Sequence, residues 1–308
     1  MVRWLVTGAS GMLGRDLIDA LGRRADAAVT AVDRATLDIT DPAAVSRLVP
    51  GHDVVVNAAA WTDVDAAEHA EAAATAVNGA AVADLARACA ESGARLLQIS
   101  TDYVFAGTAR TPYGEYAPTD PVNAYGRSKL VGEAALRLLL PEHGYLVRTA
   151  WLYGEHGRNF VATMLGRAAE LPAVQAVADH IGQPTWSGAL ARQLVELGQA
   201  AHLGAAPPGI YHGTSAGQTT WYDLTRALFD LAGLDPERVR PVPHTSFPRP
   251  ARRPAYSVLG HQRWQGTGVN VQAPWRDQLE QALRTPRFAA LAQIARDKSP
   301  RLQTSGHR

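Results

Sequence analysis

The sequence has one cysteine, almost no net charge and no long apolar run, and each scarcity excludes a class of protein. Cys89 alone cannot form an internal disulfide framework, and we interpret it as packing material in an alanine-rich helix over 80–92. A net charge of +1 gives no reason to expect a nucleic acid or a membrane surface as partner. No segment approaches the length of a membrane span, and residues 1–4 lead directly into a strand instead of a signal peptide. We therefore expect a cytoplasmic protein.

Metal-ligand spacing is also missing. The ten histidines follow no known ligand pattern, so we predict no metal site built by the protein. A hydrophobic fraction of 46% and a charged fraction of 19% are typical of soluble globular proteins. The length of 308 residues suits one large domain or two smaller ones.

A glycine-rich turn follows the first predicted strand, residues 3–6, and precedes an amphipathic helix. Glycines in the pattern Gly-x-x-Gly-x-x-Gly at a strand-to-helix turn allow a tight turn, and the helix N-terminus then attracts a diphosphate. This position makes the pattern a dinucleotide-binding fingerprint. The predicted cofactor contacts in this turn are Gly8, Ser10, Gly11, Met12, Leu13 and Gly14.

Asp33 ends the second predicted strand, nineteen residues after Gly14, where an acid can accept hydrogen bonds from the adenosine ribose. Arg34 follows, and its guanidinium could instead hold a 2′-phosphate. The acid favours NADH and the arginine favours NADPH, and both stay open. Asp38 and Ile39 either flank the adenine or simply form a turn.

Strands and helices alternate from the first residue to about residue 150. This rhythm predicts an α/β fold with a doubly wound parallel sheet, the Rossmann arrangement, whose ligands bind at the carboxyl ends of the strands. The third strand, residues 53–57, ends in Asn57 and is followed by Ala58 and Ala59. Such small residues let a cofactor lie close to the backbone.

An acid/base group is predicted around the fourth strand, residues 95–99. Thr101 follows that strand, and a later helix places Tyr125 and Lys129 one turn apart on one face. A phenol can protonate a carbonyl oxygen, and a nearby ammonium would lower the pKa of that phenol. Tyrosine and lysine at this spacing also occur on ordinary solvated helices, so the dinucleotide fingerprint decides in favour of carbonyl–alcohol chemistry.

The second half of the chain predicts a smaller α/β lobe. We expect a helix over 159–171, a strand over 174–177, a helix over 187–201 and a further strand of the main sheet over 209–212. The predicted domains are residues 1–150 with about 184–217 for the dinucleotide, and about 151–183 with 218–285 for the substrate. We expect residues 287–308 to form a tail that consists of a loosely docked helix with a partly disordered end. The basic loop 249–254 suits a diphosphate or is merely solvated.

Residues 213–217 match the Gly-x-Ser-x-Gly nucleophile elbow of hydrolases. Thr219 or Thr220, however, resembles the N-cap of the next helix, which makes the stretch an ordinary strand-to-helix turn. A hydrolase function would also not explain the dinucleotide-binding fingerprint.

Taken together, these motifs resemble the extended short-chain dehydrogenase/reductase superfamily and, more narrowly, the dTDP-4-dehydrorhamnose reductase family. The resemblance covers about residues 2–283, and its most specific stretches are 100–105, 148–154 and 252–259. It implies that NADPH or NADH reduces the C4 keto group of a dTDP-4-keto-6-deoxy sugar, most simply to dTDP-L-rhamnose.

The resemblance also implies roles for single residues. Tyr125 would protonate the C4 oxygen, while Lys129 would hold the nicotinamide ribose and lower the pKa of Tyr125. Thr101 would bond the same oxygen and Asp102 a sugar hydroxyl. Tyr103 stands where related 4,6-dehydratases carry a glutamate, so dehydration is not expected. Further substrate contacts implied by the resemblance are Tyr103, Trp151 and either Arg252 or Arg253, the last two at the dTDP phosphates.

Two alternatives stay open. A close variant of the family, the dTDP-dihydrostreptose synthase type, reduces a related dTDP-keto-hexose for an antibiotic. The regulatory β subunit of methionine adenosyltransferase also resembles this family and acts as a binding partner, because a fold can persist without its chemistry. The sequence does not determine the stereochemistry of the sugar or whether the protein is a homodimer.

Overall fold

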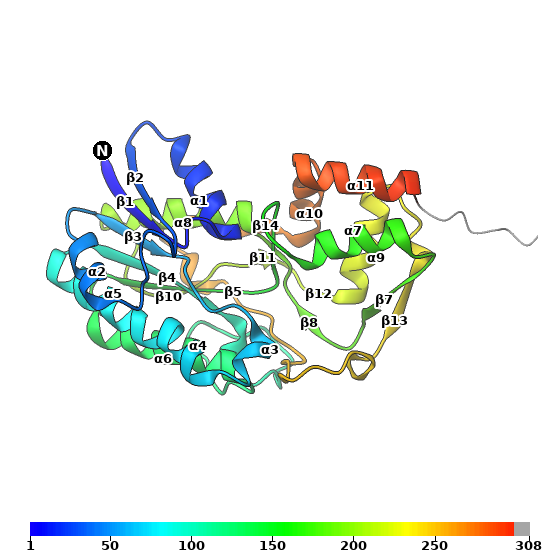
Figure 1. Ribbon diagram of the computed structural model, residues 1–308, viewed down its shortest axis with the longest axis horizontal. Helices are drawn as coiled ribbons and strands as arrows, with labels where there is room; N and C mark the ends of the chain where they lie inside the picture. Colours follow the sequence, from blue (N-terminus) through cyan, green and yellow to red (C-terminus); the bar gives the residue numbers. More distant parts are fainter. Residues whose placement is uncertain (299–308) are drawn as a thin grey trace, which may run out of the picture.

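Six parallel strands form the main sheet of the computed structural model, which describes residues 1–298 (Figure 1). The strand order is β10-β5-β4-β3-β1-β2, so the direction of winding changes between β1 and β3. In such sheets a ligand binds beyond the carboxyl ends at this switch point. The strands are β1 (Val2–Thr7), β2 (Ala27–Val32), β3 (Val54–Asn57), β4 (Arg95–Thr101), β5 (Gly144–Thr149) and β10 (Gly209–His212).

Helices cover both faces of this sheet, because the side chains of each strand point alternately to either side. Trp4 and Leu97 pack with α1 and α8, whereas Leu5 and Leu96 pack with α2, α5 and α6 on the opposite face. The predicted doubly wound α/β sheet is therefore confirmed. The covering helices are α1 (Met12–Gly22), α8 (Ser187–His202), α2 (Pro42–Leu48), α5 (Ala81–Ser92) and α6 (Ala124–Leu139).

Local caps set where two of these helices begin. The Asp41 carboxylate accepts hydrogen bonds from the N–H groups of Ala43 and Ala44, at 3.0 and 3.2 Å. Asn123 accepts from the Gly126 N–H at 2.8 Å and so starts α6. Short helical segments lie between the strands and α6, namely α3 (Val64–Ala67), α4 (Glu71–Thr75), η1 (Ala76–Ala80) and η2 (Asp102–Val104).

A second, smaller lobe has its own core, in which Leu165, Leu228 and Phe229 are fully buried. Its helices gather on the right of Figure 1, beside the paired strands β7 and β13. They are α7 (Phe160–Glu170), α9 (Trp221–Leu231), α10 (Trp275–Leu283) and α11 (Pro286–Lys298). The short strands are β6 (Leu152–Tyr153), β7 (Val174–Val177), β8 (Ile181–Gly182), β9 (Thr185–Trp186), β11 (Ser215–Ala216), β12 (Thr219–Thr220), β13 (Val239–Val242) and β14 (Gln272–Pro274), with 3-10 turns η3 (Pro236–Arg238), η4 (His244–Ser246) and η5 (Gln262–Trp264).

The C-terminal helix α11 differs from the loosely docked helix that the sequence predicts. Phe288 and Ala295 are fully buried and Ala292 nearly so, within the core of the smaller lobe. An apolar face that repeats every three to four residues anchors the helix firmly. The predicted disordered end falls on residues 299–308, which lie outside the described part of the chain.

Two minor predictions are confirmed by burial. Cys89 is fully buried, and desolvation raises the pKa of its thiol to about 12, so it is packing material. Ser215 of the nucleophile-elbow pattern is also fully buried, and its hydroxyl donates to the Pro184 carbonyl at 2.7 Å. Thr220 caps α9 as predicted. A serine hydrolase site at this turn is thereby excluded.

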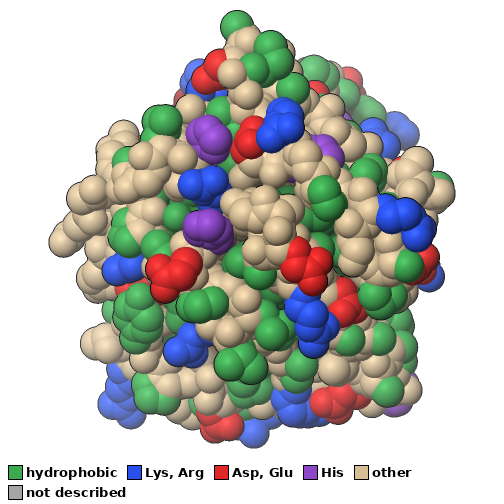
Figure 2. Space-filling model, turned by 90° about the vertical axis from the view of Figure 1, so that its left-hand side faces the viewer, with side chains coloured by type: hydrophobic (Ala, Val, Ile, Leu, Met, Phe, Trp, Pro, Cys, Tyr) green, Lys and Arg blue, Asp and Glu red, His purple; other side chains and the backbone are tan. Residues whose placement is uncertain are grey.

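The surface carries intermixed charges. Figure 2 shows acidic and basic side chains side by side on the face at the left of Figure 1, as a net charge of +1 leads one to expect. Among the described residues, no helix is both long and apolar enough to cross a membrane.

Candidate active site

A cleft of about 1000 Å³ lies at the carboxyl edge of the main sheet. Loops that follow five successive strands line it, and the smaller lobe contributes Trp221, Gly157 and Arg158. Most of the residues predicted from the sequence meet here. They are Gly8, Ser10, Gly11, Met12, Leu13, Gly14, Asp33, Arg34, Asp38, Ile39, Asn57, Ala58, Ala59, Thr101, Asp102, Tyr103, Tyr125, Lys129 and Trp151.

The glycine turn has the close packing that a dinucleotide site needs. Gly8 has φ +67°, and a Cβ atom there would lie 2.6 Å from the Ala59 backbone nitrogen. Only glycine fits such a position. Helix α1 begins at Met12 without a side-chain cap and without an acid in its first turn. Its N-terminus is therefore free to attract a diphosphate, and these residues fit a dinucleotide.

Two acids beside the turn are partly engaged in local hydrogen bonds. The Asp33 carboxylate accepts from the N–H groups of Ala35 and Thr36, at 3.1 and 3.3 Å. Asp38 likewise accepts from the Thr40 hydroxyl at 2.7 Å, so it forms a turn and lines the cleft at once. Arg34 forms no hydrogen bond or ion pair with any residue in the described range 1–298, which leaves its guanidinium available.

A chain of buried hydrogen bonds joins the ends of three neighbouring strands below the cleft. The Thr7 hydroxyl donates to the Asn57 side-chain oxygen at 2.5 Å. The Asn57 amide donates to the Gln98 side-chain oxygen at 2.7 Å, and Gln98 donates in turn to the Ile99 carbonyl. This network fixes the strand ends and so the floor on which a cofactor would rest.

Thr101, Tyr125 and Lys129 converge, as predicted, where β4 meets α6. The Thr101 hydroxyl lies close enough to the Tyr125 phenol to lower its pKa. The Lys129 ammonium donates to the Ile99 carbonyl at 2.7 Å, and burial lowers the pKa of Lys129 to about 8.

Burial is the largest influence on the pKa of Tyr125. Burial and, to a smaller extent, the Asp102 carboxylate together raise it to about 12, although the neighbouring Thr101 hydroxyl opposes the shift. The Lys129 ammonium itself is directed at the Ile99 carbonyl. The effect of the ammonium on this pKa, which the family resemblance implies, stays a prediction.

Asp102 lies beside this group and is 2% exposed. Burial raises the pKa of its carboxyl to about 7. One oxygen, Oδ1, receives a hydrogen bond from the Thr101 hydroxyl at 3.1 Å. The other, Oδ2, is buried and meets no donor with good hydrogen-bond geometry among residues 1–298, although the Ser257 hydroxyl lies near the carboxyl and lowers its pKa. A buried acceptor without a partner at a cleft is suited to a ligand hydroxyl.

Aromatic rings border the other side of the cleft. Tyr103 meets Tyr125 edge to face, with ring centroids 6.0 Å apart. Trp151 stacks on Trp221 with centroids 3.6 Å apart and ring planes 9° from parallel. Trp221 is not among the residues predicted from the sequence, because the first residue of a capped amphipathic helix carries no signal for a binding site.

The two arginines predicted for the phosphates do not line the cleft. Arg253 forms a two-pronged ion pair with Asp65, at 2.6 and 2.9 Å, and Arg252 is exposed. The Arg253 guanidinium, which also lies near Tyr103, is engaged by the Asp65 carboxylate, and the sequence has no signal for this pairing. Arg158 lines the cleft instead and forms no hydrogen bond or ion pair with any residue from 1 to 298.

A buried ion pair holds α6 in place behind the site. The Arg148 guanidinium meets the Glu133 carboxylate at 2.6 and 2.9 Å, with both side chains 3% exposed. The Ser100 hydroxyl donates to the same carboxylate at 2.6 Å. These contacts tie β4 and β5 to α6, and removing one partner would leave an uncompensated buried charge.

The geometry agrees with the relatives of this chain. The family model described as "RmlD substrate binding domain" matches residues 2–287. The dTDP-4-dehydrorhamnose reductase of Streptomyces griseus is 53% identical over 282 residues, which are 91% of this chain and 92% of that protein. The chain belongs to the dTDP-4-dehydrorhamnose reductase family. The predicted resemblance is thereby confirmed.

Other family members extend the comparison. The dTDP-4-keto-6-deoxy-D-glucose reductase of Streptomyces niveus is 50% identical over 91% of this chain and 96% of its own length. A crystal structure of dTDP-4-dehydrorhamnose reductase from Bacillus anthracis in complex with NADP superposes with a TM-score of 0.86 at 33% identity. The superposition covers 92% of this chain and 99% of the Bacillus anthracis chain. Both relatives are named as reductases, which favours an enzyme over a binding partner without activity.

Proposed function

We propose that this protein reduces the C4 keto group of a dTDP-4-keto-6-deoxy sugar with NADPH, most simply dTDP-4-dehydro-L-rhamnose to dTDP-L-rhamnose. The observation that carries the proposal is the convergence of Thr101, Tyr125 and Lys129 in the cleft that begins at the glycine turn. The smaller lobe contributes Trp221 and Arg158 to the same cleft, and we assign it to the sugar nucleotide.

Each polar group has a role in this reaction. A phenol with a pKa of about 12 keeps its proton at neutral pH, so Tyr125 can donate that proton to the C4 oxygen as the carbonyl becomes an alcohol. Thr101 orients the same oxygen, and Asp102 accepts a hydrogen bond from a sugar hydroxyl. Lys129 holds the ribose beside the nicotinamide. When bound, NADPH supplies the hydride.

The surroundings of Asp33 and Arg34 support NADPH over NADH. The Asp33 carboxylate already accepts hydrogen bonds from its own turn, whereas the Arg34 guanidinium is not engaged in hydrogen bonds or ion pairs within residues 1–298. A free guanidinium suits a 2′-phosphate. The relative crystallised with NADP supports the same choice.

A second candidate differs only in the sugar. The Streptomyces niveus relative is named as a dTDP-4-keto-6-deoxy-D-glucose reductase, and its identity of 50% is close to that of the first relative. A reductase of this kind would use the same cofactor and the same acid, but would accept a sugar that has not been epimerised.

The deciding experiment follows NADPH oxidation by absorbance with dTDP-4-keto-6-deoxyglucose, made by a 4,6-dehydratase, with and without the upstream epimerase. The product sugar is identified in the same reaction. Oxidation that requires the epimerase and gives dTDP-L-rhamnose supports the first candidate, and oxidation without the epimerase supports the second. Tight NADPH binding without oxidation of either sugar would contradict both.

A further inference from the structure

Two strands of the smaller lobe bring three distant metal-ligand side chains to one edge. Strands β7 and β13 are parallel, with Val177 opposite Val242. Their pairing continues through a hydrogen bond from the Ala178 N–H to the Val242 carbonyl at 3.0 Å. Asp179 lies two residues beyond the end of β7, and His244 lies two residues beyond the end of β13. His180 follows Asp179 in the chain.

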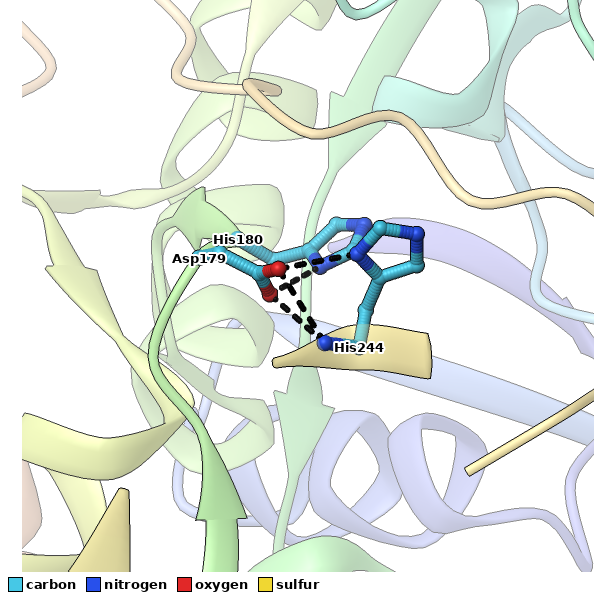
Figure 3. A group of neighbouring side chains, drawn as sticks. All are labelled: Asp179, His180 and His244. Atoms are coloured by element: carbon cyan, nitrogen blue, oxygen red, sulfur yellow. Dashed lines mark hydrogen bonds and ion pairs between the residues drawn. The ribbon is translucent and has the colours of Figure 1, made fainter. Parts of the chain in front are cut away.

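The side chains of these three residues point toward one another (Figure 3). Nδ1 of His180 lies 3.3 Å from one oxygen of the Asp179 carboxylate. Nδ1 of His244 lies 2.9 Å from the other oxygen. The two imidazole rings are nearly perpendicular, with centroids 4.8 Å apart. One ligand atom from each residue falls within 4.8 Å of the others.

We propose that Asp179, His180 and His244 form a binding site for a divalent cation of the zinc class. Two imidazole nitrogens and one carboxylate oxygen are a donor set that Zn²⁺ accepts, with one position left for water. With ligand bonds of about 2.0 Å, neighbouring ligands of a tetrahedral ion lie about 3.3 Å apart. A carboxylate oxygen of Asp179 and Nδ1 of His180 are already 3.3 Å apart.

The setting favours a small cation with an open position. The His180 side chain is 10% exposed and forms the inner wall, while those of Asp179 and His244 are 42% and 59% exposed. Water can therefore complete the coordination from the outer side. Magnesium and calcium prefer oxygen donors and are poorly matched to two imidazoles. None of the three residues lines the active-site cleft, so this site is separate.

The absence of metal-ligand spacing in the sequence does not argue against the site. The pair Asp179–His180 has no third ligand nearby in the chain, and His244 becomes a neighbour only through the pairing of β7 with β13. The same contacts also fit a simpler arrangement, in which Asp179 only accepts hydrogen bonds from the His244 backbone and ring. Direct binding distinguishes the two.

The test titrates Zn²⁺ into metal-free full-length protein by calorimetry at neutral pH. Wild type should bind Zn²⁺ but not Mg²⁺, and His244→Ala and Asp179→Asn should each raise the Kd for Zn²⁺ at least about 100-fold, more than loss of an outer-sphere partner does. The matched control is His156→Ala, which removes the histidine from the other Asp/His group of the described chain, Asp16, Asp19 and His156. That control should bind as wild type does.

Three results would overturn the proposal: no Zn²⁺ binding by wild type at micromolar concentration, unchanged binding in both site variants, or equal loss in the His156 control. Circular dichroism of each variant checks folding. Cobalt gives a second measurement that needs no variant, because imidazole ligands produce visible absorption bands that Zn²⁺ should abolish by competition. Binding should also weaken at lower pH, since protons compete for the imidazoles.

Discussion

The indole of Trp221 lies flat against that of Trp151, with centroids 3.6 Å apart. Trp151 is the only residue other than glycine with a positive φ, 43°, within the described range 1–298. A Cβ atom at Gly182 would overlap the same indole, so Trp151 is held from two sides. A left-handed backbone costs on the order of 1–3 kcal/mol, and stacking that contributes about 0.5–1.5 kcal/mol offsets part of this cost.

We predict that Trp221→Ala releases Trp151 and weakens substrate binding. The KM for the keto sugar should rise about tenfold, equivalent to about 1.4 kcal/mol, with a smaller change in kcat. Trp221→Phe keeps an aromatic surface and should remain close to wild type. Steady-state kinetics measure both, and an unchanged KM in the alanine variant would show that the stack does not position Trp151.

Tyr125→Phe removes the proposed proton donor while leaving the ring in place. We expect kcat to fall by about 10² to 10⁴, the range for loss of a general acid. The Kd for NADPH, measured by fluorescence titration, should stay within about twofold of wild type because the binding groups remain. Turnover at the wild-type rate would sink the assignment of Tyr125.

The stability of the ligand-free protein should depend on Asp102. Burial raises the pKa of its carboxyl from an ordinary 3.8 to about 7. Between these values the folded protein keeps a proton that the unfolded chain releases, so rising pH reduces the stability of wild type by up to about 1.4 kcal/mol per pH unit. Above about pH 7 the loss levels off.

Asp102→Asn lacks this titration. Relative to wild type, its free energy of unfolding should therefore rise from pH 4 to pH 7 and then stay constant. Urea unfolding across this range measures the difference. A difference that does not change with pH would mean that the Asp102 carboxyl has a normal pKa in the folded protein.

Arg158 and Arg252 form a matched pair for testing diphosphate binding. Arg158 lines the cleft without an ion pair to any described residue, whereas Arg252 does not line it. Arg158→Ala should weaken the binding of dTDP or NADPH about tenfold by removing a charge-assisted hydrogen bond. Arg252→Ala should leave both affinities unchanged. Calorimetry with dTDP and with NADPH measures these affinities. Weaker binding in Arg252→Ala but not in Arg158→Ala would support the phosphate contact at Arg252 that was predicted from the sequence.

Arg34→Ala tests the choice of cofactor. Without the guanidinium, the KM for NADPH should rise about tenfold or more, because a phosphate contact of about 1.5–3 kcal/mol is lost. The KM for NADH should change little, since NADH has no 2′-phosphate. If both values shift alike, Arg34 acts on the fold of the turn and not on the phosphate.

The sequence by itself determined the features that depend on near neighbours. Apolar strands alternating with amphipathic helices predict the doubly wound sheet, because each strand must be covered on both faces. The caps at Asp41 and Thr220 and the turn at Gly8 follow from local backbone hydrogen bonding and from φ. The spacing of Tyr125 and Lys129 places both side chains on one face of α6. They meet Thr101 at the carboxyl edge of the sheet, where ligands of such sheets bind.

Only the tertiary structure decided where long side chains point and how burial acts on charge. Arg253 pairs with Asp65, 188 positions away, and does not line the cleft. Burial is the largest cause of the raised pKa of Tyr125, followed by the Asp102 carboxylate. His244 joins Asp179 through strand register. Pairings between residues far apart in the chain, and the desolvation that accompanies them, depend on which surfaces are brought together, and no local pattern encodes that.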